Sequence, residues 1–128
     1  MQREIPRSVS EELEKVGGVR GALKNIPERS RLRHIGGVFQ SLSDPIRLAI
    51  LYSLSATPLC VCLIRNLVKI SDSKLSYHLS CLKKAGLITK QSEGKYIVYR
   101  ITFLGKRMIS TCDEIQRPSV LFSTSKTV

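Results

Sequence analysis

The sequence predicts a small α+β fold that is mostly α-helical, and three observations support this prediction. The chain has 128 residues, the usual size of one domain with a modest core. Its central part carries apolar residues at helical spacing. After Gly86 the apolar period changes to two, which is typical of strands. We therefore expect short helices followed by a two-stranded β-hairpin and a closing helix.

The net charge of +11 is concentrated in the middle of the chain. Residues 29–107 hold fourteen basic and three acidic side chains, whereas the segments before and after them are balanced. A folded segment with this bias attracts a polyanion, and nucleic acid is a commoner partner than a membrane surface. No stretch approaches the roughly 20 apolar residues of a membrane span, and the N-terminal residues lack the basic-then-apolar pattern that is typical of a secretory signal. We expect a cytoplasmic protein with reduced cysteines and no membrane partner.

Residues 1–34 predict an N-terminal extension with one short helix. Ser10 is the expected N-cap, glutamates fill the first turn, and Gly17 and Gly18 end the helix. The stretch from Val19 to His34 contains glycine and proline, so we expect irregular or weakly helical structure there. We assign no function to this extension.

Two helices are expected next. A short apolar helix ends at Leu42, and Asp44 caps the following helix, with Pro45 at its first position. The expected buried face of that second helix consists of Ile46, Ala49, Ile50 and Leu54.

Two further short helices, joined by Lys69 and Ile70, have the spacing of a helix-turn-helix. The apolar residues of the first are Val61, Ile64, Leu67 and Val68. Ser71 caps the second helix, and Gly86 ends it. The inner face of this second helix is expected to consist of Leu75, His78, Leu79 and Leu82. In such a motif the second helix enters the major groove of DNA.

The hairpin predicted after Gly86 has strands at 87–90 and 96–101, with a turn at 92–95. A closing helix runs from about Thr102 to Ile115, and one of its faces carries Leu104, Met108, Cys112 and Ile115. This order of elements is that of a winged helix-turn-helix with a hairpin wing. We expect residues 35–117 to form the DNA-binding and dimerisation domain, with a C-terminal dimerisation helix, and residues 118–128 to form a flexible tail.

Five motifs resemble the ArsR/SmtB family of repressors over about half of the chain, from Phe39 to Thr102. They are LSDPIRL at 42–48, LCVCL at 59–63, SYHL at 76–79, KAGL at 84–87 and GKYIVYR at 94–100. The resemblance implies a homodimer that reads an inverted-repeat operator in double-stranded DNA. It also implies release from that operator when a metal, a metalloid or an oxidant reaches the cysteines.

Seven side chains are candidates for DNA contact. They are Ser73, Lys74, Ser76 and Tyr77 on the second helix of the motif, and Lys90, Lys95 and Arg100 along the wing. Lysine donates to guanine, serine reaches bases or phosphates, and tyrosine packs on a thymine methyl or on the backbone. The wing residues are placed to contact phosphates. His78 lies at the inner edge of its helix, where we expect a packed, hydrogen-bonded histidine rather than a metal ligand.

The pair Cys60 and Cys62 is the candidate sensing site. Thiolates at positions i and i+2 around a helix N-terminus converge on one soft ion, and the helix dipole favours the thiolate. Arsenic(III), antimony(III), cadmium and lead all prefer sulfur ligands. The metalloid sensors of the resembling family carry a cysteine pair here, flanked by acidic residues. This chain has Leu59 and Leu63 at the flanks, and Arg65 where some members have a third cysteine.

A third ligand is expected from Cys112, because the resemblance places the closing helix at the dimer interface. The equally weighted alternative is that Cys112 packs as a small apolar residue. Cys81 is expected in the core. The histidine and carboxylate zinc site of other family members is not expected on the closing helix, since the only histidines are His34 and His78.

Three classes of function remain open from the sequence. The first is a repressor released by As(III), Sb(III) or a soft divalent metal, with no cofactor needed for DNA binding. The second is a repressor that responds to thiol oxidation, sulfide or polysulfide, in which Cys60 or Cys62 links to Cys112. The third is a winged-helix regulator with no cysteine effector. We do not expect an enzyme, because the sequence suggests no nucleophile and base, no phosphate loop and no paired carboxylates.

Overall fold

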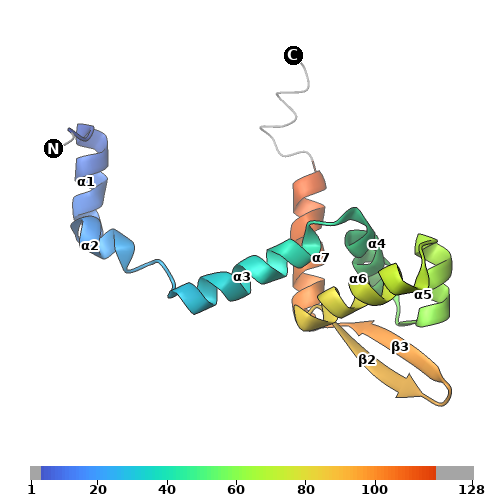
Figure 1. Ribbon diagram of the computed structural model, residues 1–128. Helices are drawn as coiled ribbons and strands as arrows, with labels where there is room; N and C mark the ends of the chain where they lie inside the picture. The colour runs from blue at the N-terminus through green and yellow to red at the C-terminus, as the bar shows by residue number, and fades with distance from the viewer. Residues whose placement is uncertain (1–3, 118–128) are drawn as a thin grey trace, which may run out of the picture. The chain divides into compact units, whose positions relative to one another are not determined.

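A computed structural model describes residues 4–117 and has a winged helix-turn-helix fold. Its elements are α1 (Arg7–Lys15), α2 (Gly18–Leu23), α3 (Arg29–Leu42), α4 (Pro45–Ala56), β1 (Leu59–Cys60), α5 (Val61–Val68), α6 (Asp72–Lys84), β2 (Ile88–Glu93), β3 (Tyr96–Ile101) and α7 (Phe103–Gln116) (Figure 1). The chain divides into two compact units that meet at Gly36 and Gly37, inside α3. The tail expected at 118–128 lies outside the described residues.

The N-terminal unit has more helix than the sequence led us to expect. It holds α1, α2 and the first part of α3 in place of one short helix, and the stretch expected to be irregular is largely helical. The N-cap position of α1 is Pro6, so Ser10 lies inside the helix and does not cap it. Gly17 has a φ of 92°, a left-handed conformation that lets the chain turn directly from α1 into α2.

The start of α4 is as predicted. The side chain of Asp44 accepts hydrogen bonds from the backbone N–H groups of Ile46 at 2.7 Å and Arg47 at 3.3 Å, and Pro45 is the first helical residue. The buried face of the helix differs from the prediction, because it consists of Arg47, Ile50, Leu51 and Leu54. Ala49 is exposed, which corrects the expected apolar stripe.

The helix-turn-helix consists of α5 and α6. The hydroxyl of Ser71 accepts from the backbone N–H of Lys74 at 3.3 Å and caps α6, as predicted. The inner face of α6 is also confirmed, because Leu75, His78, Leu79 and Leu82 are all buried. Gly86, with a φ of 77°, follows the end of that helix. Leu67 was expected to pack inward but is exposed. Ile64 is the one residue of the short helix α5 that is fully buried.

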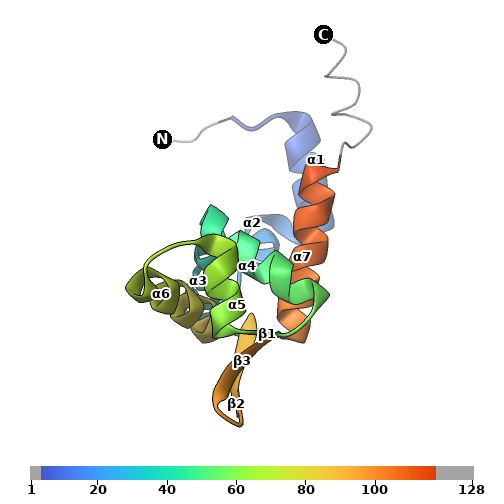
Figure 2. The same cartoon turned by 90° about the vertical axis from the view of Figure 1, so that its right-hand side faces the viewer.

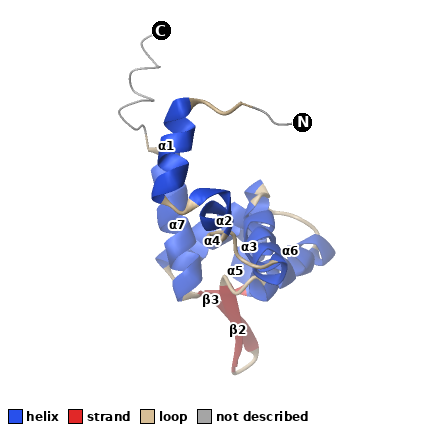
Figure 3. Ribbon diagram, turned by 90° about the vertical axis from the view of Figure 1, so that its left-hand side faces the viewer, coloured by secondary structure: helices blue, strands red, loops and turns tan. Residues whose placement is uncertain are grey.

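The predicted two-stranded hairpin is confirmed as β2 and β3, and an unpredicted two-residue strand, β1, joins it to give a three-stranded sheet. The strand order is β1-β3-β2, and all pairs are antiparallel. Figure 2 labels the three strands, and Figure 3 shows β2 and β3 in red. In β1, Leu59 lies opposite Tyr99 and Cys60 lies opposite Val98. The first strand of the hairpin extends to Glu93, so the turn is the two residues Gly94 and Lys95 rather than 92–95. A glycine with a φ of 60° at the first position suits such a tight turn.

The closing helix α7 is confirmed within one residue at each end. The hydroxyl of Thr102 accepts from the backbone N–H of Gly105 at 3.0 Å, which caps the helix, and donates to the carbonyl of Gly86 at 2.6 Å. The start of α7 is thereby fastened to the end of α6. One core joins α3, α4, α5, α6, α7 and the sheet, and its buried apolar side chains begin at Val38. No helix in residues 4–117 has the length and apolar character needed to cross a membrane.

Candidate nucleic-acid interface and cysteine pair

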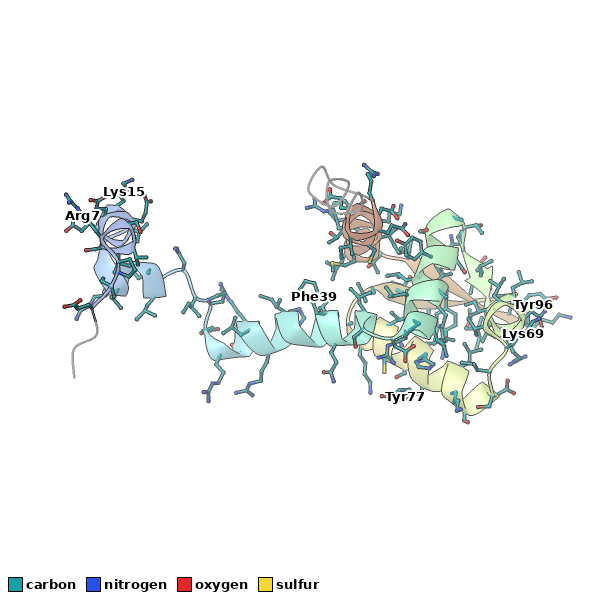
Figure 4. The ribbon with its side chains drawn as sticks, turned by 90° about the horizontal axis from the view of Figure 1, so that it is seen from above. Arg7, Lys15, Phe39, Lys69, Tyr77 and Tyr96 are labelled. Atoms are coloured by element: carbon teal, nitrogen blue, oxygen red, sulfur yellow. The ribbon has the colours of Figure 1, made fainter. Side chains whose placement is uncertain are left out.

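The outward face of α6 carries the four side chains predicted to read DNA. Ser73, Lys74, Ser76 and Tyr77 are all exposed, and 63% of the Tyr77 surface is accessible. Tyr77 is labelled in Figure 4. Because the opposite face of the same helix is buried, these four side chains are among those that a molecule approaching the outward face could contact. Three of them have polar groups suited to base edges or phosphates, and Tyr77 adds an aromatic ring.

The turn before α6 is fixed by an ion pair that the sequence analysis did not predict. Arg65 Nε lies 2.6 Å from Asp72 Oδ1, so the end of α5 is tied to the first residue of α6. Lys69, between the two helices, adopts a left-handed φ of 51°. The pair is separated by seven residues across a turn, and no regular helical spacing brings such residues together. Only the geometry of the motif shows that they meet.

The three basic residues of the wing do not share one face. Residues directly opposite each other in a sheet lie on the same face, and successive residues alternate. Lys90 is opposite the buried Tyr99, whereas Arg100 is opposite Thr89 on the other face. Arg100 also pairs with Glu93 at 3.2 Å, which partly neutralises it. Lys95 lies at the tip, with its Nζ 5.6 Å from the centre of the ring of Tyr96, so it is the wing cation that projects farthest.

The cysteine pair lies at the junction of β1 and α5. Cys60 is the last residue of β1 and occupies the N-cap position of α5, while Cys62 is the second residue of that helix. Their Sγ atoms are 2.7 Å apart, and both thiols are free. The hydrogen bond with Cys62 lowers the pKa of Cys60, helped by the backbone N–H of Leu63. The same bond raises the pKa of Cys62. Cys60 is therefore the thiol of the pair that ionises more readily.

The two sulfur atoms are the kind of donor that a soft metal ion prefers, but the pair supplies only two ligands. Two thiolates on one tetrahedral ion lie about 3.8 Å apart, so the side chains must rotate outward to hold one. Residues 4–117 contain no group of three or more cysteine, histidine or acidic side chains placed to hold a metal ion. Cys112 thus does not complete the site within one chain. It is half-buried on α7, and burial together with Asp113 raises the pKa of its thiol.

Two further predictions concerned residues of α6. His78 is buried and its Nδ1 lies 2.9 Å from Nη1 of Arg47, so the prediction of a packed, hydrogen-bonded histidine is confirmed. Cys81 was expected in the core but is half-buried. The buried position of Arg47 was not predicted, because a charged residue in an apolar helix gives no sign that it points inward.

Comparison with known proteins places this arrangement among characterised folds. Residues 44–90 match the family described as bacterial regulatory protein, arsR family. The cadmium resistance transcriptional regulatory protein CadC of Listeria innocua is 36% identical over 89 residues, which cover 69% of this chain and 71% of that protein. The arsenical resistance operon repressor of Bacillus subtilis is 41% identical over 69 residues, which cover 53% of this chain and 66% of that repressor.

A solved structure supports the same assignment of fold. The homodimeric winged helix-turn-helix DNA-binding domain Mb0332 of Mycobacterium bovis matches with a TM-score of 0.64 at 24% identity, covering 71% of this chain and 87% of that domain. These proteins are regulators rather than enzymes. The CadC match extends over more than two thirds of both proteins and includes the helix-turn-helix. The chain therefore belongs to the ArsR family of bacterial regulatory proteins.

Proposed function

We propose that this protein is a homodimeric repressor that leaves its operator when a soft metal ion or metalloid binds Cys60 and Cys62. The observation that carries this proposal is the placement of two free thiols side by side at the junction of β1 and α5. The cadmium and arsenical resistance regulators to which the chain is similar support a thiophilic effector. We propose that residues 35–117 bind DNA and dimerise, in the cytoplasm, where the operator lies.

DNA binding is assigned to α6 and the wing. Ser73, Lys74, Ser76 and Tyr77 would meet the major groove, and Lys90, Lys95 and Arg100 would meet the flanking phosphates. A two-fold dimer would present two such helices to successive turns of an inverted repeat. No cofactor takes part in this contact.

The proposed switch has a direct route to the wing. Cys60 is a sheet residue opposite Val98 of β3, and Cys62 belongs to the first turn of α5. An ion bound by both thiolates would link β1 to α5 and displace both elements. Because β3 continues into the hairpin whose tip carries Lys95, a displacement of β1 would be felt by the phosphate-contacting residues. A coupling of about 1–3 kcal/mol would weaken operator binding by roughly one to two orders of magnitude.

Cys112 would act in trans, from α7 of the partner, either as a third thiolate or as a redox partner. The lowered pKa of Cys60 also suits attack on an oxidant or a polysulfide, which keeps thiol oxidation as the second candidate mechanism. The two mechanisms use the same cysteines and differ in what triggers them.

The deciding experiment is a DNA-binding titration of the reduced protein. Arsenite, antimonite, cadmium, zinc and a polysulfide donor are added separately to the complex with a duplex selected from a random pool. We expect release by one or more of the thiophilic ions, and loss of that response in Cys60→Ser/Cys62→Ser with nearly unchanged DNA affinity. Cys81→Ser, which removes a thiol outside the pair, is the control. A full response of the double variant would reject sensing by this pair, and release by polysulfide alone would favour oxidation.

A further inference from the structure

The guanidinium group of Arg47 joins three helices. Nε donates to the carbonyl of Ser41 at 2.6 Å, and Nη2 donates to the carbonyl of Gln40 at 3.5 Å, both at the end of α3. Nη1 lies 2.9 Å from Nδ1 of His78, in the middle of α6. Only 9% of Arg47 and 8% of His78 are exposed. One buried side chain of α4 therefore connects the end of α3 to the DNA-reading helix.

The direction of this hydrogen bond follows from the chemistry of its partners. An arginine guanidinium keeps its protons in proteins and has only donors. Nδ1 of His78 must therefore be the acceptor, and the ring proton is on Nε2 in a neutral imidazole. The contact thus selects one tautomer and one orientation of the ring.

Hydrogen bonds to two carbonyls and an imidazole, rather than a salt bridge, hold the buried guanidinium group. Within residues 4–117 no salt bridge includes Arg47, and Asp44 accepts from its backbone N–H instead of its side chain. A buried guanidinium is costly unless its donors are satisfied, so each acceptor that it has is held firmly. His78 is the only one of these acceptors that belongs to α6.

The other buried contacts of α6 are less specific about its rotation, and the ion pair of Asp72 with Arg65 at its start is exposed to solvent. Leu75, Leu79 and Leu82 pack by apolar contact, which depends on buried area and little on direction. A hydrogen bond loses strength as its angle departs from linear, so it resists rotation of the helix about its axis. His78 also makes an edge contact with the ring of Tyr77, whose centre is 5.6 Å away at an interplanar angle of 62°. The held imidazole thus lies beside a side chain of the DNA-facing surface.

We propose that Arg47 and His78 are a positioning pair that sets the rotation of α6 and thereby the specificity of DNA reading. Neither residue contacts DNA in this scheme. Loss of the hydrogen bond would leave the positive surface in place, so attraction to any duplex would persist. Alignment of the outward side chains with base edges would be lost, and with it the discrimination between sequences. This inference rests on DNA binding by α6, which is part of the proposed function.

The test measures a specificity ratio, which is the affinity for a duplex selected by the wild-type protein divided by the affinity for a scrambled duplex. His78→Leu keeps a similar volume but has no acceptor, whereas His78→Asn places an amide oxygen near the position of Nδ1. We expect the ratio to fall about tenfold in His78→Leu, with nonspecific affinity unchanged, and to recover to within about threefold of wild type in His78→Asn.

Two further variants separate positioning from general stability. Ile109→Val trims the core on α7, away from the pair, and serves as a variant of lowered stability whose ratio should stay at the wild-type value. Arg47→Lys keeps the charge but loses the planar fork, and its ratio should fall as in His78→Leu. If His78→Leu does not fold, the Arg47→Lys ratio decides.

Several results would overturn the inference. The first is an unchanged specificity ratio in His78→Leu or, when that variant does not fold, in Arg47→Lys. The second is a folded His78→Asn whose ratio does not recover. The third is a fall in Ile109→Val as large as that in His78→Leu. Failure of the wild-type protein to select any duplex would be a different result, because it would reject the proposed function itself.

Discussion

The hydroxyl group of Tyr52 donates a hydrogen bond of 2.8 Å to Oδ1 of Asp113 and so joins α4 to α7. The amide of Gln116 donates to the same oxygen at 3.2 Å. The bond to Asp113, together with burial, raises the pKa of Tyr52 to about 12. The neutral phenol is thus the form that the folded protein stabilises.

This bond predicts a loss of stability at alkaline pH. The ordinary pKa of tyrosine is about 10, so the contribution of the bond is fully present below pH 10 and disappears as the pH rises through about 12. In Tyr52→Phe this part of the alkaline decline should be absent. The measurement is the free energy of unfolding in urea across that range, with Tyr96→Phe on the exposed wing as the control. An identical decline in Tyr52→Phe and wild type would contradict the prediction.

Two glycines should respond in opposite ways to alanine. A Cβ on the buried Gly105 of α7 would collide with the carbonyl of Leu87 and the side chain of Ile101 at the base of the wing. Gly105→Ala should lower the free energy of unfolding by about 1–3 kcal/mol, as overpacking does. Gly37→Ala, with open space around the new Cβ in α3, should raise it by about 0.5–1 kcal/mol. Denaturant titration distinguishes the two signs, and equal effects would be unexpected.

Two lysines should differ in how they affect DNA binding. Lys74 lies on the outward face of α6, so Lys74→Ala should cost about 1–3 kcal/mol at a selected duplex and less at a scrambled one. Lys95 lies at the wing tip, so Lys95→Ala should weaken both duplexes equally and reduce the salt slope by about one. Fluorescence anisotropy at several salt concentrations tests both statements. A sequence-dependent loss in Lys95→Ala would instead place that residue at a base edge.

The assembly of the protein can be tested on α7. Its face of Leu104, Met108, Cys112 and Ile115 remains partly open, and 73% of Ile115 is exposed. If this face is buried in a dimer, a charge placed on it would be buried without a partner and would dissociate the two subunits. Ile115→Glu should therefore sediment as a monomer and bind the selected duplex more weakly. Ser110→Glu, on another side of the helix, should remain dimeric. Dimers of Ile115→Glu would place the interface elsewhere.

The route from the cysteine pair to the wing has its own test. If a bound ion acts by moving the wing, a protein that lacks the two wing lysines has less wing contact with DNA for the ion to weaken. Cadmium should weaken DNA binding by about 10–100-fold in wild type and in Lys74→Ala, but by less than about threefold in Lys90→Ala/Lys95→Ala. Absorbance of the thiolate–cadmium bond checks that all three proteins bind the ion. An undiminished response of the double variant would assign the coupling to α5 and α6 instead.

Local signals account for the parts of the fold that the sequence predicted well. Asp44 before Pro45, and Ser71 before α6, are caps whose partners lie within three residues, so their hydrogen bonds can be anticipated from sequence alone. The change of apolar period after Gly86 likewise indicates strands without knowledge of their partners. The outward face of α6 followed from its cap and its buried positions.

Three of the features that were missed depend on residues far apart in the chain. A two-residue strand such as β1 has no period of its own and exists because Cys60 pairs with Val98. The bond between Arg47 and His78 spans 31 residues, and the bond between Tyr52 and Asp113 spans 61. Spacing identified Cys60 and Cys62 as a pair, since they are two residues apart. It could not show that one of them belongs to a sheet.

The position of the core has a consequence for how this chain can change in evolution. Every buried side chain in residues 4–117 lies at or after Val38, so no position before it contributes to the packed interior. Insertions, deletions and substitutions among the first 36 residues therefore leave the interior of the winged unit intact. The sequence of that segment can therefore change under selection for partners or for assembly, while substitutions in the winged unit are limited to those that its packed core tolerates.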